Sequence, residues 1–158
     1  MAEDTPQELG VLAKVVIAIA FVLIVAGVVW YGITLRTLLR LWHDLVEEPS
    51  GPMKFRFIMQ PSMAALVAIR DGYKDARTGR SPYFWAVLRK SDERMGRLRE
   101  GLNATARIIL LALALDLIYQ FLVLKTFYPN EALIIALLLA FVPYVLIRGL
   151  VTRIAQIR

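Results

Sequence analysis

The sequence predicts an all-α membrane protein with three transmembrane helices, and three observations lead to this fold class. Hydrophobic residue types make up 58% of the 158 residues, whereas charged types make up 20%. A soluble domain has about 45–50% apolar residues, so this excess is too large for one modest core. The apolar residues gather in three long runs, each of a length that can cross a bilayer. The absence of cysteine and the single histidine exclude disulfides, thiolate metal sites and histidine-cluster metal sites.

The first transmembrane helix is predicted over residues 15–35, a run without charge that covers roughly the 30 Å of a hydrocarbon layer. Residues 1–14 precede it as a short external segment. This segment carries Glu3, Asp4 and Glu8 in place of the basic cluster of a signal peptide, which favours an uncleaved helix.

The second and third transmembrane helices are predicted over residues 107–125 and 132–151. The short external turn at residues 126–131 makes them a tight hairpin, and residues 152–158 form a cytoplasmic tail. Most of the 19 lysine and arginine residues lie from Arg36 to Arg107. The positive-inside rule therefore predicts an external amino terminus, a cytoplasmic middle segment and a cytoplasmic carboxy terminus.

The middle segment, residues 36–106, is predicted to form cytoplasmic amphipathic helices that lie on the bilayer. Apolar and polar side chains fall on opposite sides of a helix over residues 36–48, which Pro49 ends. A second helical run follows over residues 62–76. Residues 57–69 are apolar except for Gln60 and Ser62, so this stretch either lies flat at the interface or dips in as a re-entrant segment.

Basic residues alternate with acidic ones after the Tyr83-Phe84-Trp85 triplet, and a helix is expected from Pro82 onward. Two interpretations remain open, a solvated juxtamembrane face and a surface that contacts anionic lipids. The residues concerned are Arg89, Lys90, Arg94, Arg97 and Arg99. Nothing here resembles a nucleic-acid-binding module.

Asp116 is the sharpest single feature of the sequence, because it falls near the middle of the second predicted transmembrane helix. A carboxylate at that depth costs about 2.5–3.5 kcal/mol. Tyr119 and Gln120 follow three and four residues later and share its helix face. This intramembrane polar site either handles a proton or cation, or forms hydrogen bonds between helices that fix packing or oligomer register.

Small residues recur every four positions in the third predicted transmembrane helix, at Ala132, Ala136 and Ala140. Tyr144 and Arg148 continue the same spacing. Such a stripe lets two helix backbones approach closely. We expect it to pack on the second transmembrane helix, although a subunit interface would use the same pattern.

Asp71 and Asp75 lie four residues apart on one face of a predicted helix. Two carboxylates can bind a hard cation, but pairing with Arg70, Lys74 and Arg77 on the same helix is the favoured interpretation. No nucleophile–base pair, glycine-rich phosphate loop or metal-ligand spacing is present. The sequence therefore predicts neither an enzyme nor a cofactor.

Several short motifs carry a resemblance, namely Phe57-Ile58-Met59-Gln60-Pro61, Arg70-Asp71-Gly72, Asp75-Ala76-Arg77, Pro82-Tyr83-Phe84-Trp85 and Leu102-Asn103-Ala104-Thr105-Ala106-Arg107. They resemble motifs of uncharacterised small inner-membrane proteins of proteobacteria with three transmembrane helices. The resemblance covers most of the chain and implies the inner membrane of a bacterium as location. It implies no activity.

The functional hypothesis is a non-enzymatic accessory subunit or self-associating scaffold with a basic, lipid-facing cytoplasmic surface. Its expected partners are membrane lipids and either copies of itself or a larger membrane complex. The alternative is a homo-oligomeric ion channel or proton-coupled transporter that uses Asp116, because three helices enclose little volume alone.

Overall fold

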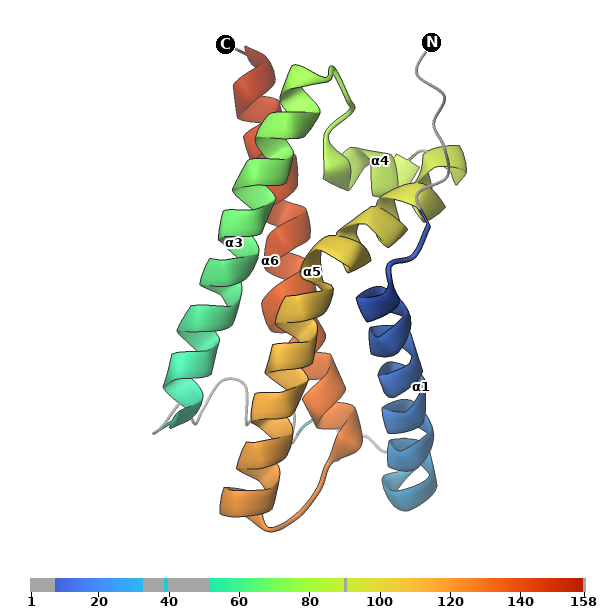
Figure 1. The fold of residues 1–158 in the computed structure, drawn as a ribbon, viewed down its shortest axis with the longest axis vertical. Coiled ribbons are helices and arrows are strands. Elements are labelled where there is room, and N and C mark those ends of the chain that lie inside the picture. Colours follow the sequence, from blue (N-terminus) through green and yellow to red (C-terminus); the bar gives the residue numbers. More distant parts are fainter. Residues whose placement is uncertain (1–7, 33–38, 40–51, 90, 158) are drawn as a thin grey trace.

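A computed structural model describes residues 8–32, 39, 52–89 and 91–157, and this part of the chain is helical, without strands. The elements are α1 (Val11–Tyr31), α3 (Pro52–Arg77), α4 (Tyr83–Arg89), α5 (Ser91–Tyr119), the π-helical segment η1 (Gln120–Leu124) and α6 (Pro129–Ile157). Four long helices lie side by side, and the short α4 lies near one end of them (Figure 1).

Three helices are long and apolar enough to cross a membrane, which confirms the fold class at this level. They cover Val11–Tyr31, Arg94–Leu122 and Pro129–Ile157. The first begins before the predicted residue 15, with Lys14 in its first turn, and ends at Gly32, whose φ of 64° favours glycine. Helix α5 also begins well before the predicted residue 107, because its charged first turns continue into the apolar part without a break.

Helices α1 and α5 run in the same direction, and hydrogen bonds at the two ends of α1 link it to the middle of α5 and to the turn that follows η1. At one end, the backbone N–H of Gly10 donates to Oδ1 of Asn103 at 2.8 Å. At the other, the hydroxyl of Tyr31 donates to the carbonyl of Phe127, just after α5, at 2.8 Å. Helix α6 runs the opposite way, so residue 8 and the carboxy-terminal end lie toward the same end of the bundle (Figure 1). The structure therefore does not support the predicted placement of the termini on opposite faces.

Helix α3 is continuous from Pro52 to Arg77 and includes Pro61, although proline removes one backbone donor. It lies along α6, in the most extensive contact between any two described helices (Figure 1). The predicted re-entrant dip at 57–69 is not supported, because the helix continues through this stretch without a reversal of direction. The predicted flat helix on the bilayer surface is not supported either. Apart from residue 39, the predicted helix 36–48 falls outside the described residues.

Small side chains set the close packing of α3 on α6. Ala64 and Ala68 of α3 are fully buried, and so are Ala132, Ala136 and Ala140 of α6. A methyl group added at Gly72 would lie 2.9 Å from the backbone oxygen of Arg148, so the two backbones nearly touch there. The predicted close approach is present, but the residues that continue the alanine stripe contact α3. The expectation that Ala132, Ala136 and Ala140 pack on the second transmembrane helix stays a prediction, and the contact of Tyr144 and Arg148 with α3 was not anticipated.

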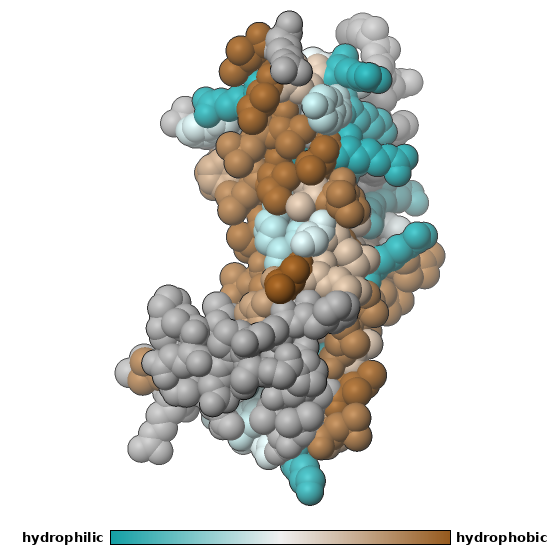
Figure 2. All heavy atoms as spheres, turned by 90° about the vertical axis from the view of Figure 1, so that its left-hand side faces the viewer, coloured by the Kyte–Doolittle hydropathy of each residue, from teal (hydrophilic) through white to brown (hydrophobic). Residues whose placement is uncertain are grey.

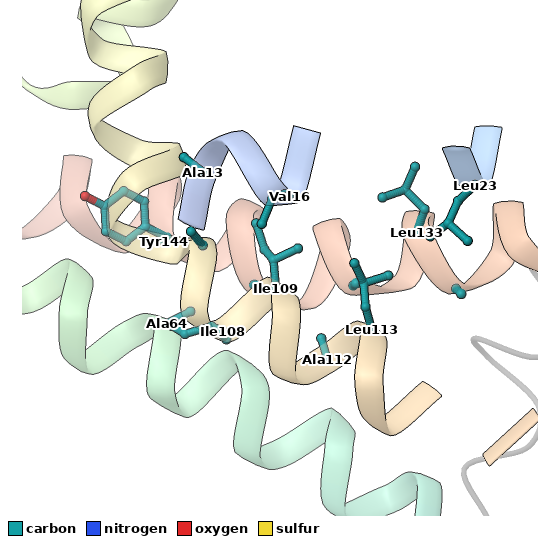
Figure 3. Packing of buried hydrophobic residues seen from close by; sticks show 14 of the residues in the cluster. Ala13, Val16, Leu23, Ala64, Ile108, Ile109, Ala112, Leu113, Leu133 and Tyr144 are labelled. Atoms are coloured by element: carbon teal, nitrogen blue, oxygen red, sulfur yellow. The ribbon is translucent and has the colours of Figure 1, made fainter. Parts of the chain in front are cut away.

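The apolar core lies between these four helices (Figure 3). Helix α1 contributes Ala13, Val16 and Leu23, and α5 contributes the larger set Ile108, Ile109, Ala112 and Leu113. Much of the outer surface of α1 is apolar and exposed, as a helix surrounded by lipid requires.

Candidate functional site: a buried charge cluster among four helices

Arg148 of α6 is the centre of a charge cluster, which we define as Asp75, Arg97, Glu100 and Arg148. Its guanidinium donates from Nε to Oδ2 of Asp75 at 2.8 Å and from Nη2 to Oδ1 at 2.9 Å. The same Nη2 lies 2.6 Å from Oε1 of Glu100. Such two-point contacts between guanidinium and carboxylate are the strong form of charge-assisted hydrogen bond.

Arg97 of α5 is the second cation of the charge cluster. Its Nη1 lies 3.3 Å from both carboxylate oxygens of Asp75 and 3.5 Å from Oε2 of Glu100. Its Nη2 donates to the carbonyl of Ser81 at 3.2 Å, which ties the start of the α4 region to α5. Arg80 lies at the rim, 3.9 Å from Asp75, and is half exposed.

Two tyrosines enclose the charge cluster. The hydroxyl of Tyr144 donates to Oδ2 of Asp71 at 2.8 Å and accepts from Nη1 of Arg148 at 2.6 Å. The ring of Tyr83, on α4, lies 4.5 Å from the guanidinium carbon of Arg148, in a cation–π contact. The hydroxyl of Tyr83 donates to the carbonyl of Arg97, and burial raises the pKa of Tyr83 to about 12.

Burial makes the charge balance of this cluster decisive. Asp75 and Arg148 are each 1% exposed and Arg97 is 7% exposed. An ion taken out of water costs several kcal/mol unless an opposite charge and hydrogen bonds compensate it. Two arginines face two carboxylates here, so the four groups compensate one another. The arrangement can hold α3, α5 and α6 in one register.

The sequence placed Asp71 and Asp75 on one helix face, and the structure shows both facing α6. Their partners differ from the favoured prediction, because they come from α5 and α6 and not from α3 itself. Among the described residues, no group of three or more acidic, histidine or cysteine side chains is close enough to hold a metal ion.

The predicted lipid-contacting set divides into different environments. Arg97 belongs to the charge cluster, so its assignment to lipid contact was wrong. Its guanidinium is buried because it pairs with the carboxylates of Asp75 and Glu100. Arg94 is exposed, yet its guanidinium donates to the carbonyls of Val87 and Leu88 at 2.8 and 3.0 Å and so caps the end of α4. Arg99 is half-buried. The side chain of Arg89 and the whole of Lys90 fall outside the described residues.

The predicted intramembrane site is brought together in part. Asp116 is 1% exposed and Gln120 is 3% exposed. The amide of Gln120 donates to Oδ2 of Asp116 at 2.9 Å, and its Oε1 accepts the backbone N–H of Tyr128 at 2.8 Å. These bonds link the end of α5 to the turn before α6. Tyr119 ends α5, and its side chain falls outside the described part.

Sequence reasoning missed Arg148, Tyr144, Glu100 and Tyr83 as site residues. The sequence did contain a pattern that could have identified two of them. Tyr144 and Arg148 continue the four-residue spacing of the buried alanine stripe. A residue on a buried stripe is itself buried, and a buried arginine needs carboxylate partners. Nothing in the sequence indicated which carboxylates these would be.

Comparisons with protein-family models, with curated proteins and with solved structures found no match for this chain. The functional argument therefore rests on the geometry described above.

Proposed function

We propose that this chain is a non-enzymatic protein of a bacterial inner membrane, either an accessory subunit of a membrane complex or a scaffold that associates with itself. The charge cluster is the observation that carries the proposal. Its ionisable groups bind one another across helices, and such an arrangement stabilises the packing of those helices.

The geometry around Asp116 also supports the scaffold. Its carboxylate accepts from Gln120, and Gln120 in turn binds the backbone of Tyr128. A polar pair that closes a helical hairpin in this way stabilises packing within the membrane, where each unsatisfied polar group is costly.

The charged end of the bundle is proposed to face the cytoplasm and to contact anionic lipid headgroups. Exposed basic side chains gather around that end, where α3 finishes, at Arg70, Lys74, Arg77 and Arg80. The positive-inside rule assigns such an end to the cytoplasmic face. Each cation near an anionic surface contributes about 1 kcal/mol to binding.

A homo-oligomeric channel or proton-coupled transporter is the second candidate, and one observation favours it. Gln60 of α3 is 2% exposed, and neither polar atom of its amide has a hydrogen-bond partner within the described part of the chain. Unsatisfied polar atoms beside apolar helices are typical of water-lined paths. In this candidate, Asp116 would exchange the transported proton.

Two measurements on the purified full chain separate the candidates. Native mass spectrometry from nanodiscs records subunit number and retained lipids, and proton flux is recorded in liposomes with a trapped pH-sensitive dye. The scaffold predicts that Asp116→Asn, which keeps an acceptor for Gln120, leaves both the subunit number and the basal flux unchanged. A closed ring of subunits with a proton flux that Asp116→Asn abolishes, while the ring persists, would establish the transporter.

A further inference from the structure

We infer that α3 is a fourth membrane-crossing helix, and that its outer face contacts lipid acyl chains. The argument starts from α1 and α5, which run in the same direction and are linked at the two ends of α1 by Gly10 with Asn103 and by Tyr31 with Phe127. Both helices are long and apolar enough to cross a membrane. When two successive crossings have the same direction, the chain between them must cross back once.

Helix α3 has the position and the length for the return crossing. It runs opposite to α1 and α5 and alongside α6 (Figure 1). Its 26 residues extend about 39 Å at 1.5 Å per residue, which exceeds the roughly 30 Å of a hydrocarbon layer.

The register with α6 places the apolar part of α3 at bilayer depth. Asp71 binds Tyr144 and Asp75 binds Arg148, both at an offset of 73 residues, as two parallel helices in constant register require. The same offset places residues 57–69 beside residues 130–142, which belong to a candidate transmembrane helix. A helix lying flat on the membrane surface would cross α6 and would not keep such a register.

The outer face of α3 has the chemistry that hydrocarbon requires. Four large apolar side chains point away from the bundle: Ile58, Leu66, Ile69 and Tyr73, which are 70%, 69%, 39% and 52% exposed. The hydroxyl of Ser62, on the same outer side, is satisfied within the helix by the carbonyl of Ile58 at 2.6 Å. Where grey atoms do not cover this face, Figure 2 shows mainly hydrophobic side chains, with hydrophilic ones at the end where α3 finishes and along one flank.

Basic residues bound the uncharged stretch on both sides. Residues 57–69 extend roughly 20 Å, and Arg56 precedes them while Arg70 follows. Arginine and lysine can place their apolar stems along the hydrocarbon and their charges at headgroup level. Such flanking residues allow an uncharged stretch of about 20 Å to cross a hydrocarbon layer of about 30 Å. The buried inner face of α3 carries Gln60, Ala64, Ala68, Gly72 and Asp75. These small and polar residues lower the mean hydropathy of a helix that exposes only one side to lipid.

This topology changes which chain segments share a side of the membrane. With four crossings, Gly10 and Ile157 lie on one side of the membrane, and Gly32 and Pro52 lie on the other side with the turn at 125–128. With three crossings, Pro52 lies on the same side as Ile157 instead. The difference does not depend on which side is the cytoplasm.

Single-cysteine labelling of the full chain in intact cells tests the inference, because the chain has no cysteine of its own. The variants are Glu8→Cys, Ser50→Cys, Thr126→Cys and Ile157→Cys, each exposed to a membrane-impermeant maleimide before and after the cells are opened. We expect Ser50→Cys to label together with Thr126→Cys, and Glu8→Cys together with Ile157→Cys. Labelling of Ser50→Cys with the Ile157→Cys group would overturn the fourth crossing. Thr126→Cys and Ile157→Cys, which lie on opposite sides in both topologies, are the controls.

Discussion

Arg148 and Asp75 are 73 residues apart in the sequence, yet the guanidinium of Arg148 donates two hydrogen bonds to the carboxylate of Asp75, with N–O distances of 2.8 and 2.9 Å. Both side chains are 1% exposed. The contact joins α6 to α3, and Glu100 joins the same guanidinium to α5 at 2.6 Å. One buried cation thus contacts carboxylates of two neighbouring helices, and Arg97 adds a second link between α5 and α3.

Substitution of Arg148 tests these contacts. Arg148→Met leaves the buried Asp75 and the partly exposed Glu100 facing one arginine, and breaking a buried pair costs about 3–5 kcal/mol. We expect a loss of that size in the free energy of unfolding, measured by SDS titration in mixed micelles with circular dichroism. Arg77→Met, at an exposed arginine of α3, is the matched control and should change stability by less than about 0.5 kcal/mol.

The double variant Asp75→Asn with Arg148→Met restores the charge balance of the cluster. We expect its loss in the free energy of unfolding to be smaller than the sum of the two single losses. Strictly additive losses in the same titration would show that the two residues act independently, against the arrangement described here.

Gly72 is predicted to be intolerant of any side chain. The added methyl group of Gly72→Ala would meet the backbone oxygen of Arg148 at 2.9 Å, and the backbone cannot move aside without separating α3 from α6. Overpacking of this kind costs about 1–3 kcal/mol. Gly96→Ala is the matched control, because a methyl group there meets nothing within 4 Å.

Both glycines lie inside helices, so alanine should stabilise the helix locally by up to about 1 kcal/mol when no clash occurs. We therefore expect opposite signs from the two variants in thermal unfolding. Equal stabilisation by both would mean that α3 and α6 do not approach as closely as the structure shows.

Alkaline pH is predicted to weaken the fold through Tyr83. The unfolded phenol loses its proton near its ordinary pKa of 10, whereas burial raises the pKa of Tyr83 to about 12 in the folded chain. The folded state therefore holds the proton more tightly, and the free energy of unfolding falls as the pH rises from about 10 to about 12. At roughly 1.4 kcal/mol for each pKa unit, the loss amounts to about 2–3 kcal/mol.

Unfolding titrations at pH 9, 10, 11 and 12 measure this loss, and Tyr83→Phe should show a smaller dependence on pH than the unsubstituted chain. Tyr73→Phe, at an exposed tyrosine, should keep the full dependence. An identical pH profile for all three proteins would contradict the role of Tyr83.

Leu66 is predicted to contact acyl chains near the middle of the proposed fourth crossing. Leu66→Lys should lower the free energy of unfolding in bicelles by about 2.5–3.5 kcal/mol, the cost of a lysine at the bilayer centre. Ile157→Lys, at the end of α6 and 84% exposed, should have little effect. Equal tolerance at both positions would place the outer face of α3 outside the hydrocarbon.

Part of the candidate site followed from local patterns. The spacing of Asp71 and Asp75 and that of Asp116 and Gln120 each indicated a shared face, because residues four apart on a helix lie on one side. The stripe of Ala132, Ala136 and Ala140 indicated a buried line. The partners of these residues did not follow, because they come from other helices and only packing brings them together.

The sequence by itself determined that this protein is helical and belongs in a membrane, because hydrophobic run length and charge spacing are local properties of the chain. The tertiary structure alone decided that α3 lies along α6, that Arg148 pairs with Asp75, and that the two ends of the described chain lie toward the same end of the bundle. Helix α3 has too few apolar residues to be recognised as membrane-embedded, since one of its faces is covered by protein. What surrounds a helix depends on its neighbours, and pairing between distant residues leaves no periodic trace in a single sequence.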